Sequence, residues 1–207
     1  MCHVVLRRSR AASAPLEFGP AHNGILLTAE EFDSARFTPG FRYELLHGVL
    51  IVKPAPSLSE RDSNDELGHR LRAYRETHPR GPALDATAPE HELKIGSHRR
   101  RADRGIWCGL GRLPRPDEPP AIVIEFVSAG RRSRERDDEE KLIEYPTIGV
   151  REHWGFDRFT QRLTNYQFGP PLRKRVLTKS QTLRTPLLPG FVLPLAQLFA
   201  LANRWGE

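Results

Sequence analysis

Hydrophobic positions along the chain fall into short β-rich runs and a few stripes at helical spacing. The clearest run covers residues 121–127, which are apolar and mostly β-branched except for Glu125, with two prolines before the run and Gly130 after it. Such a run is typical of a central strand buried on both faces of a sheet. A carboxylate there is costly unless it is paired, hydrogen-bonded or bound to a metal. Glu125 therefore needs a partner, or it lies at a strand end that already reaches water.

Helical patterns flank these runs. Leu67, Leu71 and Tyr74 recur at helical spacing and predict the apolar stripe of a helix over 58–77. Thr28 followed by Glu31 forms a capping box, so a short helix begins there. By similar reasoning we expect a hairpin of residues 41–45 and 49–53, strands near 83–95 and 103–110, a helix over 131–145 that stops before Pro146, a strand pair at 153–156 and 163–166, and a final helix over 195–204.

Composition bounds the class of protein. The chain has 207 residues, of which 38% are hydrophobic and 28% charged, and this suits one domain with a full core. We expect a flexible N-terminal tail over 1–24 and the folded domain over 25–207. No apolar run approaches the length of a membrane span. The formal net charge of +6 favours a polyanionic partner, although a generic basic protein would show the same charge. Two distant cysteines form neither a disulfide framework nor a zinc spacing, so we expect a cytoplasmic protein.

A second acid accompanies Glu125. Asp103 is the nearest acid upstream on a strand-like segment, and a proline-rich loop over 111–120 separates the two. Antiparallel strands joined by such a loop would bring both carboxylates to one edge of a sheet. Paired oxygen ligands suit Mg²⁺, which could polarise a phosphodiester and lower the pKa of an attacking water. Val127 points the same way as Glu125 along a strand, so a lysine at that position would lie in the same site.

At these residues the chain resembles the PD-(D/E)xK nucleases and, more closely, the Uma-two family, whose members are described as restriction endonucleases. The resemblance runs from about Leu27 to Phe199. It rests on these segments in order: Leu27-Thr-Ala-Glu-Glu-Phe32, Tyr43-Glu-Leu-Leu-His-Gly48, Val49-Leu-Ile-Val52, Pro54-Ala-Pro-Ser57, Ala102-Asp103, Ile122-Val-Ile-Glu-Phe-Val-Ser128, Lys141 with Tyr145, Gly149-Val-Arg-Glu-His-Trp154 and Leu188-Pro-Gly-Phe191.

The resemblance implies an α/β (α+β) fold, a restriction-endonuclease-like mixed β-sheet core flanked by helices. It implies metal-dependent hydrolysis of DNA phosphodiesters with Mg²⁺, or Mn²⁺ in its place. It assigns the metal to Asp103 and Glu125, with Glu44 as an upstream acid. If the Glu44 hairpin is exposed, however, Glu44 is simply its solvent-facing residue.

The chain departs from the family pattern at three places. The proline expected before the first aspartate is Ala102, and Glu60 and Arg61 stand where the family often has a histidine. Val127 removes the lysine of the general superfamily motif, as members of this family often do.

A replacement for that lysine lies downstream. Asp137, Lys141 and Tyr145 are spaced four apart and share one stripe of the helix over 131–145. If this helix crosses the strand end, Lys141 could orient the water or stabilise the charge on the phosphate. The alternative is an ordinary ion pair on a surface helix.

Two clusters of arginine flank the acids and are candidates for contact with DNA phosphates. They are Arg99, Arg100, Arg101 and Arg104 around Asp103, and Arg131, Arg132 and Arg134 after the Glu125 strand. A solubilising surface would show the same charge runs.

We therefore predict a metal-dependent endodeoxyribonuclease whose catalytic residues are Asp103, Glu125, Lys141 and Glu44. The alternative is a nuclease fold that has lost turnover and serves as a DNA-binding or interaction module, which Val127 and Ala102 favour. A third hypothesis is a nuclease that acts on RNA. The sequence leaves a homodimer open and predicts no membrane partner.

Overall fold

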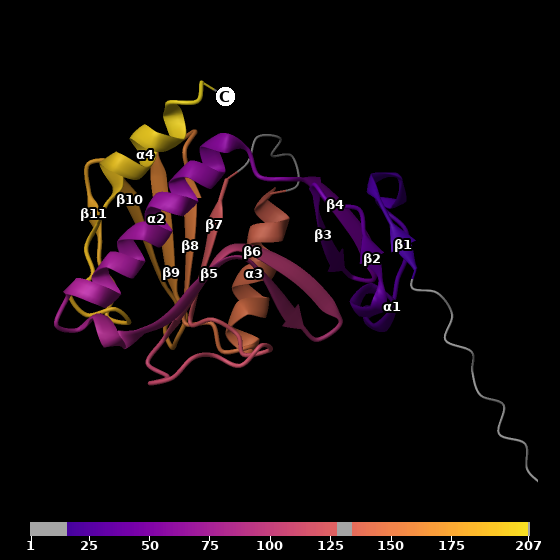
Figure 1. Cartoon of the computed structure of the whole chain (residues 1–207), viewed down its shortest axis with the longest axis horizontal. Coiled ribbons are helices and arrows are strands. Elements are labelled where there is room, and N and C mark those ends of the chain that lie inside the picture. Colours follow the sequence, from indigo (N-terminus) through magenta and orange to yellow (C-terminus); the bar gives the residue numbers. More distant parts are fainter. Residues whose placement is uncertain (1–15, 128–133, 207) are drawn as a thin grey trace, which may run out of the picture.

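The computed structural model describes residues 16–127 and 134–206. Its centre is an eight-stranded sheet in the order β10-β9-β8-β7-β6-β3-β4, with β5 paired to β6 (Figure 1). The strands are β3 (Phe41–Leu46), β4 (Val49–Pro54), β5 (Leu84–Ile95), β6 (His98–Cys108), β7 (Ile122–Phe126), β8 (Glu152–Asp157), β9 (Arg162–Gln167) and β10 (Arg173–Thr178). Only β7 and β8 pair in parallel within this sheet, so the predicted mixed sheet is confirmed.

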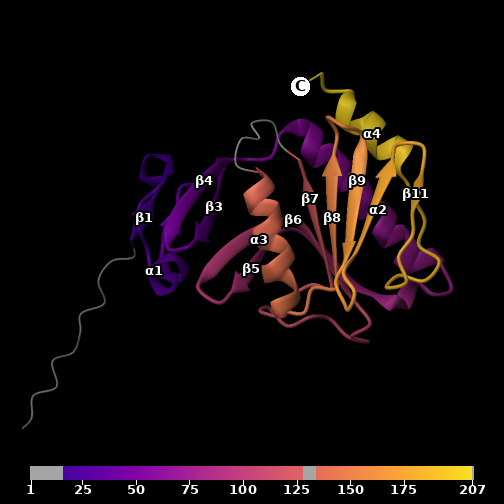
Figure 2. The same ribbon diagram turned by 180° about the vertical axis from the view of Figure 1, so that it is seen from behind.

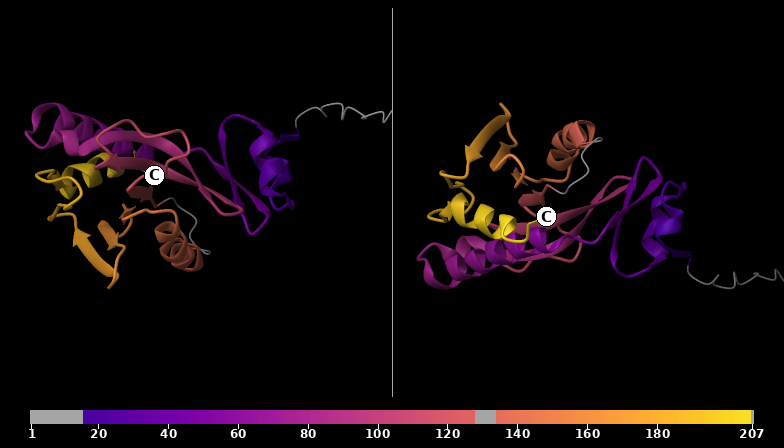
Figure 3. Two further views of the ribbon diagram at one scale, coloured as in Figure 1. Left: turned by 90° about the horizontal axis from the view of Figure 1, so that it is seen from below. Right: turned by 90° about the horizontal axis from the view of Figure 1, so that it is seen from above.

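Helices cover both faces of the sheet. Helices α2 (Leu58–Thr77) and α4 (Leu195–Asn203) lie on one face, and α3 (Arg134–Thr147) lies on the other (Figures 1 and 2). The views along the vertical axis show the same separation of α3 from the α2–α4 pair (Figure 3). Helix α2 begins where Ser57 accepts a hydrogen bond from the Glu60 N–H. Its predicted stripe of Leu67, Leu71 and Tyr74 is buried against the sheet.

The apolar core has separate parts on the two faces. The larger part joins α2 and α4 to the inner side chains of β7 and β8, among them Ile122, Ile124 and Trp154. On the α3 side, Val123 packs with Tyr145 in a smaller cluster. Strand β7 is therefore buried on both faces, as the sequence predicted.

An N-terminal layer packs on the β3–β4 hairpin. It comprises β1 (Glu17–Phe18), η1 (Pro20–His22), α1 (Ala29–Ser34) and β2 (Arg36–Phe37). Phe18 is buried there with Phe32 and Tyr43. Residues 17–24, which we expected in a flexible tail, therefore belong to the folded part. The apolar Phe18 supplies the burial that fixes them. Of the expected tail, residues 1–15 lie outside the described residues.

The sheet divides at β6. One edge of β6 pairs with β5 along most of its length. On the other edge, Arg99 pairs with Leu45 of β3, whereas residues 104–106 pair with β7. Strands β3 and β7 thus adjoin different halves of one strand, and residues 100–103 lie between them. Side chains fill this division.

Between residues 100 and 104, the side chains of β6 switch from one face of the sheet to the other. Arg100 contacts Glu144 of α3, whereas Arg104 contacts Asn64 of α2 on the opposite face. Side chains four residues apart on a regular strand would share a face. Asp103 lies within this irregular stretch.

The sequence located most elements correctly and missed several edges. The helices, the 41–54 hairpin and the β8–β9 pair are confirmed. Strand β6 begins at His98 rather than near 103, and α3 continues through Pro146 to Thr147 because a proline in the last turn breaks few helical bonds. The elements that we did not predict include β10, β11 (Thr182–Leu183), β12 (Leu193–Pro194) and η2 (Gly81–Ala83). No helix in the described ranges is long and apolar enough to cross a membrane.

Candidate active site

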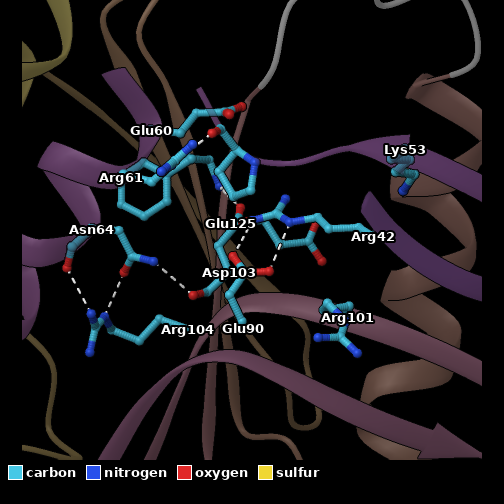
Figure 4. Close-up of polar contacts among 12 residues, drawn as sticks. Arg42, Lys53, Glu60, Arg61, Asn64, Glu90, Arg101, Asp103, Arg104 and Glu125 are labelled. Carbon is cyan, nitrogen blue, oxygen red and sulfur yellow. Dashed lines mark hydrogen bonds and ion pairs between the residues drawn. The ribbon is translucent and has the colours of Figure 1, made fainter. Parts of the chain in front are cut away.

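The antiparallel register of β6 and β7 brings the two predicted acids together. Arg104 pairs with Ile124, so Asp103 and Glu125 occupy the next facing positions. The charge of Glu125 is one of the influences that raise the pKa of Asp103. Figure 4 shows both side chains in the division of the sheet. The prediction that they lie on neighbouring strands is confirmed.

Glu125 obtains its partners from α3. Lys141 Nζ donates to one carboxylate oxygen, and the Tyr145 hydroxyl donates to the other. Lys141 is only 6% exposed, so the surface alternative for this residue is wrong. Burial alone would raise the pKa of Glu125, but the nearby charges of Lys141 and His153 and these hydrogen bonds hold it well below its usual range. The carboxylate is therefore ionised, and the charge in the apolar strand is explained.

Asp103 is buried and has a different set of partners. Its Oδ1 accepts from Arg42 Nη2 of β3, and its Oδ2 accepts from the Phe126 N–H at 2.5 Å. Burial raises the pKa of Asp103 to about 7, although Arg42 and the Phe126 N–H act in the opposite direction. Two neighbouring carboxyl groups thus differ strongly in proton affinity, which is a common feature of functional sites.

Helix α2 supports the backbone at Asp103. The Asn64 amide donates to the Asp103 carbonyl at 2.8 Å, while its oxygen accepts from Arg104 Nε at 2.6 Å (Figure 4). Arg104 also donates to the Asn64 carbonyl at 2.8 Å. Glu60, near the position where the family often has histidine, accepts from the Ser57 N–H and so caps the same helix.

Sequence reasoning missed Arg42 and Glu90. Arg42 donates from Nε to Glu90 at 2.8 Å and from Nη2 to both Glu90 and Asp103. Glu90 lies on β5 at the level of Asp103, between the pairs formed by Pro89 and His91. Only the three-dimensional pairing of β3, β5 and β6 reveals this group, since no spacing in the sequence connects these residues.

Glu44 is buried rather than solvent-facing. It is 5% exposed, accepts the Arg101 N–H at 3.0 Å and forms an ion pair with Lys53. Its carboxylate thus bridges β3 to β6 inside the division of the sheet. The reading of Glu44 as a solvent-facing hairpin residue is wrong.

The predicted arginine rim requires correction. Arg100 and Arg104 are each 1% exposed. Arg100 pairs with Glu140 and Glu144, and Arg104 bonds to Asn64 and Thr87, so these guanidinium groups face the protein interior. Arg99 is 7% exposed and pairs with Asp33.

Arg101 is the partly exposed member of that cluster, with Glu92 as a distant partner at 4.0 Å. It stays a candidate for DNA contact. Arg131 and Arg132 lie outside the described residues.

The donor set suits a hard divalent cation. Asp103 and Glu125 offer carboxylate oxygens at facing positions, and Mg²⁺ usually binds one or two carboxylates and completes its shell with water and substrate phosphate. Within residues 16–127 and 134–206, no group of three histidine, cysteine or acidic side chains gathers in a metal-binding arrangement. A site with two protein carboxylates agrees with the facing positions of Asp103 and Glu125 and needs no third side chain as a ligand.

Comparisons with known proteins concern the family and the fold of this chain. The model of the Uma2 family, described as "Putative restriction endonuclease", matches residues 29–196. A crystal structure of a putative nuclease belonging to DUF820 from Anabaena variabilis ATCC 29413 superposes with a TM-score of 0.69 at 17% identity, covering 85% of this chain and 99% of that one. No curated protein matches the chain. The chain therefore shares the fold of the Anabaena variabilis protein, and because the family match covers most of the sequence, the chain belongs to the Uma2 family.

Proposed function

We propose that this protein is a metal-dependent endonuclease that hydrolyses phosphodiester bonds of DNA. The observation that carries the proposal is the facing pair of Asp103 and Glu125 on β6 and β7, one of them ionised by contact with Lys141. Membership of a restriction endonuclease family supports the same class of reaction.

Each residue of the site has a distinct role in the proposal. Asp103 and Glu125 would hold Mg²⁺ or Mn²⁺, which when bound polarises the phosphodiester and lowers the pKa of a water ligand. Lys141 keeps Glu125 ionised and adds positive charge where the phosphate becomes more negative. Glu44 holds the β6 backbone through the Arg101 N–H, so its role is to position the site.

DNA fits the charge of the molecule. The net charge is +6, and phosphate neutralisation by arginine and lysine supplies most sequence-independent affinity for nucleic acids. We propose Arg101, Arg131 and Arg132 as contacts to the backbone. A cytoplasmic location and a homodimer stay predictions.

The first prediction concerns the two carboxylates. Asp103→Ala or Glu125→Ala each removes a metal ligand, so cleavage of plasmid DNA in Mg²⁺ should fall by at least about 100-fold. Binding of a labelled duplex in Ca²⁺ should be largely kept, because arginine contacts supply it. Glu118→Ala, which removes a carboxylate paired with Arg112 in the 111–120 loop, serves as the control and should cleave normally.

The same assay separates the alternatives. Cleavage that persists in EDTA, or that is unchanged in the Glu125 variant, contradicts the proposal. Binding without cleavage in either Mg²⁺ or Mn²⁺ favours the catalytically silent module. Preferential cleavage of a matched RNA strand identifies an RNA substrate.

A further inference from the structure

Arg42 joins two carboxylates at the centre of the candidate site. Its Nε and Nη2 atoms bind Glu90 as a fork, and Nη2 also binds Asp103 (Figure 4). The three residues come from β3, β5 and β6, which meet where the sheet divides. A bidentate arginine–carboxylate contact fixes the plane of the guanidinium group.

The backbone of Glu90 is bent to make this contact. Its φ angle is +51°, in the left-handed region that non-glycine residues rarely adopt. Such conformations persist where the surrounding structure enforces them and are concentrated at functional sites. Pro89 and His91 on either side keep their pairing with β6, so the distortion is confined to the residue that binds Arg42.

One nitrogen of the Arg42 guanidinium group takes no part in these contacts. Nη1 donates no hydrogen bond within the described residues, while the side chain is 17% exposed. Burial would lower the pKa of Arg42, but the charges of Asp103 and Glu90 outweigh burial and raise it, so the group keeps its charge. A charged donor next to Asp103, with its plane fixed and two N–H groups available, is suited to an anionic oxygen.

The charges of the cluster favour the same ligand. Asp103, Glu125 and Glu90 face two cations, Arg42 and Lys141. A divalent ion on the two metal carboxylates would therefore leave these five side chains with a net positive charge, to which the nearby charge of His153 adds. The negative charge of a phosphodiester suits this surplus.

We propose that Arg42 is a further catalytic residue, which donates from Nη1 to the phosphodiester being cleaved, and that Glu90 is the positioning residue that holds it. This inference rests on the proposed nuclease function. Its competitor is a structural role in which Arg42 only neutralises the buried Asp103.

The test compares cleavage kinetics of Arg42→Gln, Arg42→Lys and Glu90→Gln with the unmodified protein at saturating Mg²⁺. We expect Arg42→Gln to lower kcat by about 100-fold, with an equal loss at pH 7 and pH 9. Arg42→Lys should recover part of the rate, since it restores the charge without the fork. Glu90→Gln should lower kcat by about tenfold and leave KM nearly unchanged, since the donor is kept but less well oriented.

Arg70→Gln is the matched control, because Arg70 is also partly buried and paired with a glutamate, on the outer part of α2. It should cleave like the unmodified protein. If the unmodified protein and Arg70→Gln cleave DNA and Arg42→Gln cleaves equally well, only this inference fails. If the loss in Arg42→Gln disappears at pH 9, the structural role is correct and the inference is overturned.

A failure of the unmodified protein to cleave would instead overturn the proposed function, and the inference with it. Thermal melts of every variant check folding. If Arg42→Gln does not fold, the inference is tested by the kcat values of Arg42→Lys and Glu90→Gln. Lowered values in both support the inference, and normal values in both overturn it.

Discussion

Glu125 depends on α3 for its charge. Its carboxylate and the Lys141 ammonium are both largely buried, with side chains 19% and 8% exposed. A buried pair gains little over an apolar pair, but removing one partner leaves the other charge without compensation. The proposed catalytic arrangement and the attachment of α3 to the sheet therefore rely on the same contact.

We predict that Lys141→Met lowers the free energy of unfolding by about 3 kcal/mol at pH 7 in urea denaturation without metal. The pKa of Glu125 is depressed in the folded protein, so the pair stabilises fully above its ordinary value of 4.5 and loses effect as the pH falls below it. The cost of Lys141→Met should shrink accordingly in acid. In a Glu125→Gln background the substitution should cost less than half as much, and equal costs in the two backgrounds would disprove this coupling.

At the residue scale, the sequence identified acids more reliably than cations. Glu125 was conspicuous because an apolar strand surrounds it, and Lys141 because four-residue spacing placed it on one stripe with Tyr145. Arg100 and Arg104 were misassigned to the surface, since their partners Glu144 and Asn64 lie about 40 residues away in the chain. Charge runs indicate solvent exposure only when such distant partners are missing.

At the scale of elements, the fit of α2 on β6 depends on a glycine. A Cβ atom at Gly68 would lie 2.7 Å from Arg104 Nη2 and 2.9 Å from its Cζ and Nη1. Arg104 cannot easily move, because Asn64 and Thr87 hold its guanidinium group. The glycine lets the helix backbone approach the strand that carries Asp103.

Gly68→Ala tests this contact. In an unobstructed helix the substitution stabilises by up to about 1 kcal/mol, but here the clash should destabilise the protein by about 1–3 kcal/mol in urea denaturation. In an Arg104→Ala background the same change should become stabilising, because the obstructing group is gone. A stabilising effect in the unmodified protein would show that Arg104 does not restrict the helix.

Elements were predictable in proportion to their burial. Helix α2 was predicted from its apolar stripe, which is buried in the structure. Strand β10 was missed because its residues are exposed apart from Leu177, so the apolar alternation that marks a strand is absent. The division of the sheet at β6 also escaped prediction, since pairing with β3 and β7 involves residues far apart in the chain.

On the scale of the whole molecule, the N-terminal layer has its own core. Phe18 packs with Phe32, Tyr43, Leu45 and Leu50, apart from the clusters around α2 and α3. The Gly24 N–H donates to the Leu50 carbonyl at 2.8 Å, so the segment before α1 is tied to β4. The boundary of the folded part lies upstream of Phe18.

Two truncations test this boundary. Deleting residues 2–15 should change the melting midpoint by no more than about 2 °C, whereas deleting residues 2–24 should lower it by about 6 °C or more, because Phe18 burial is lost. Phe18→Ala in the full chain should reproduce much of the larger drop. Similar melting midpoints for the two truncations would show that residues 17–24 do not stabilise the folded part.

The β5–β6 hairpin contributes residues to two of the core clusters and pairs with β3 next to the third, and this has a consequence for folding cooperativity. Leu93 and Ala102 belong to the cluster around α3, whereas Leu84 and Ile106 belong to the cluster around α2. Arg99 pairs with Leu45 of the β3–β4 hairpin, on which the N-terminal layer packs. A strand pair shared by several cores cannot detach from one without weakening the others, so local opening there approaches the free energy of global unfolding. Asp103 and Glu90 lie on this hairpin. We therefore expect the site to be lost together with the fold as a whole, in a single transition.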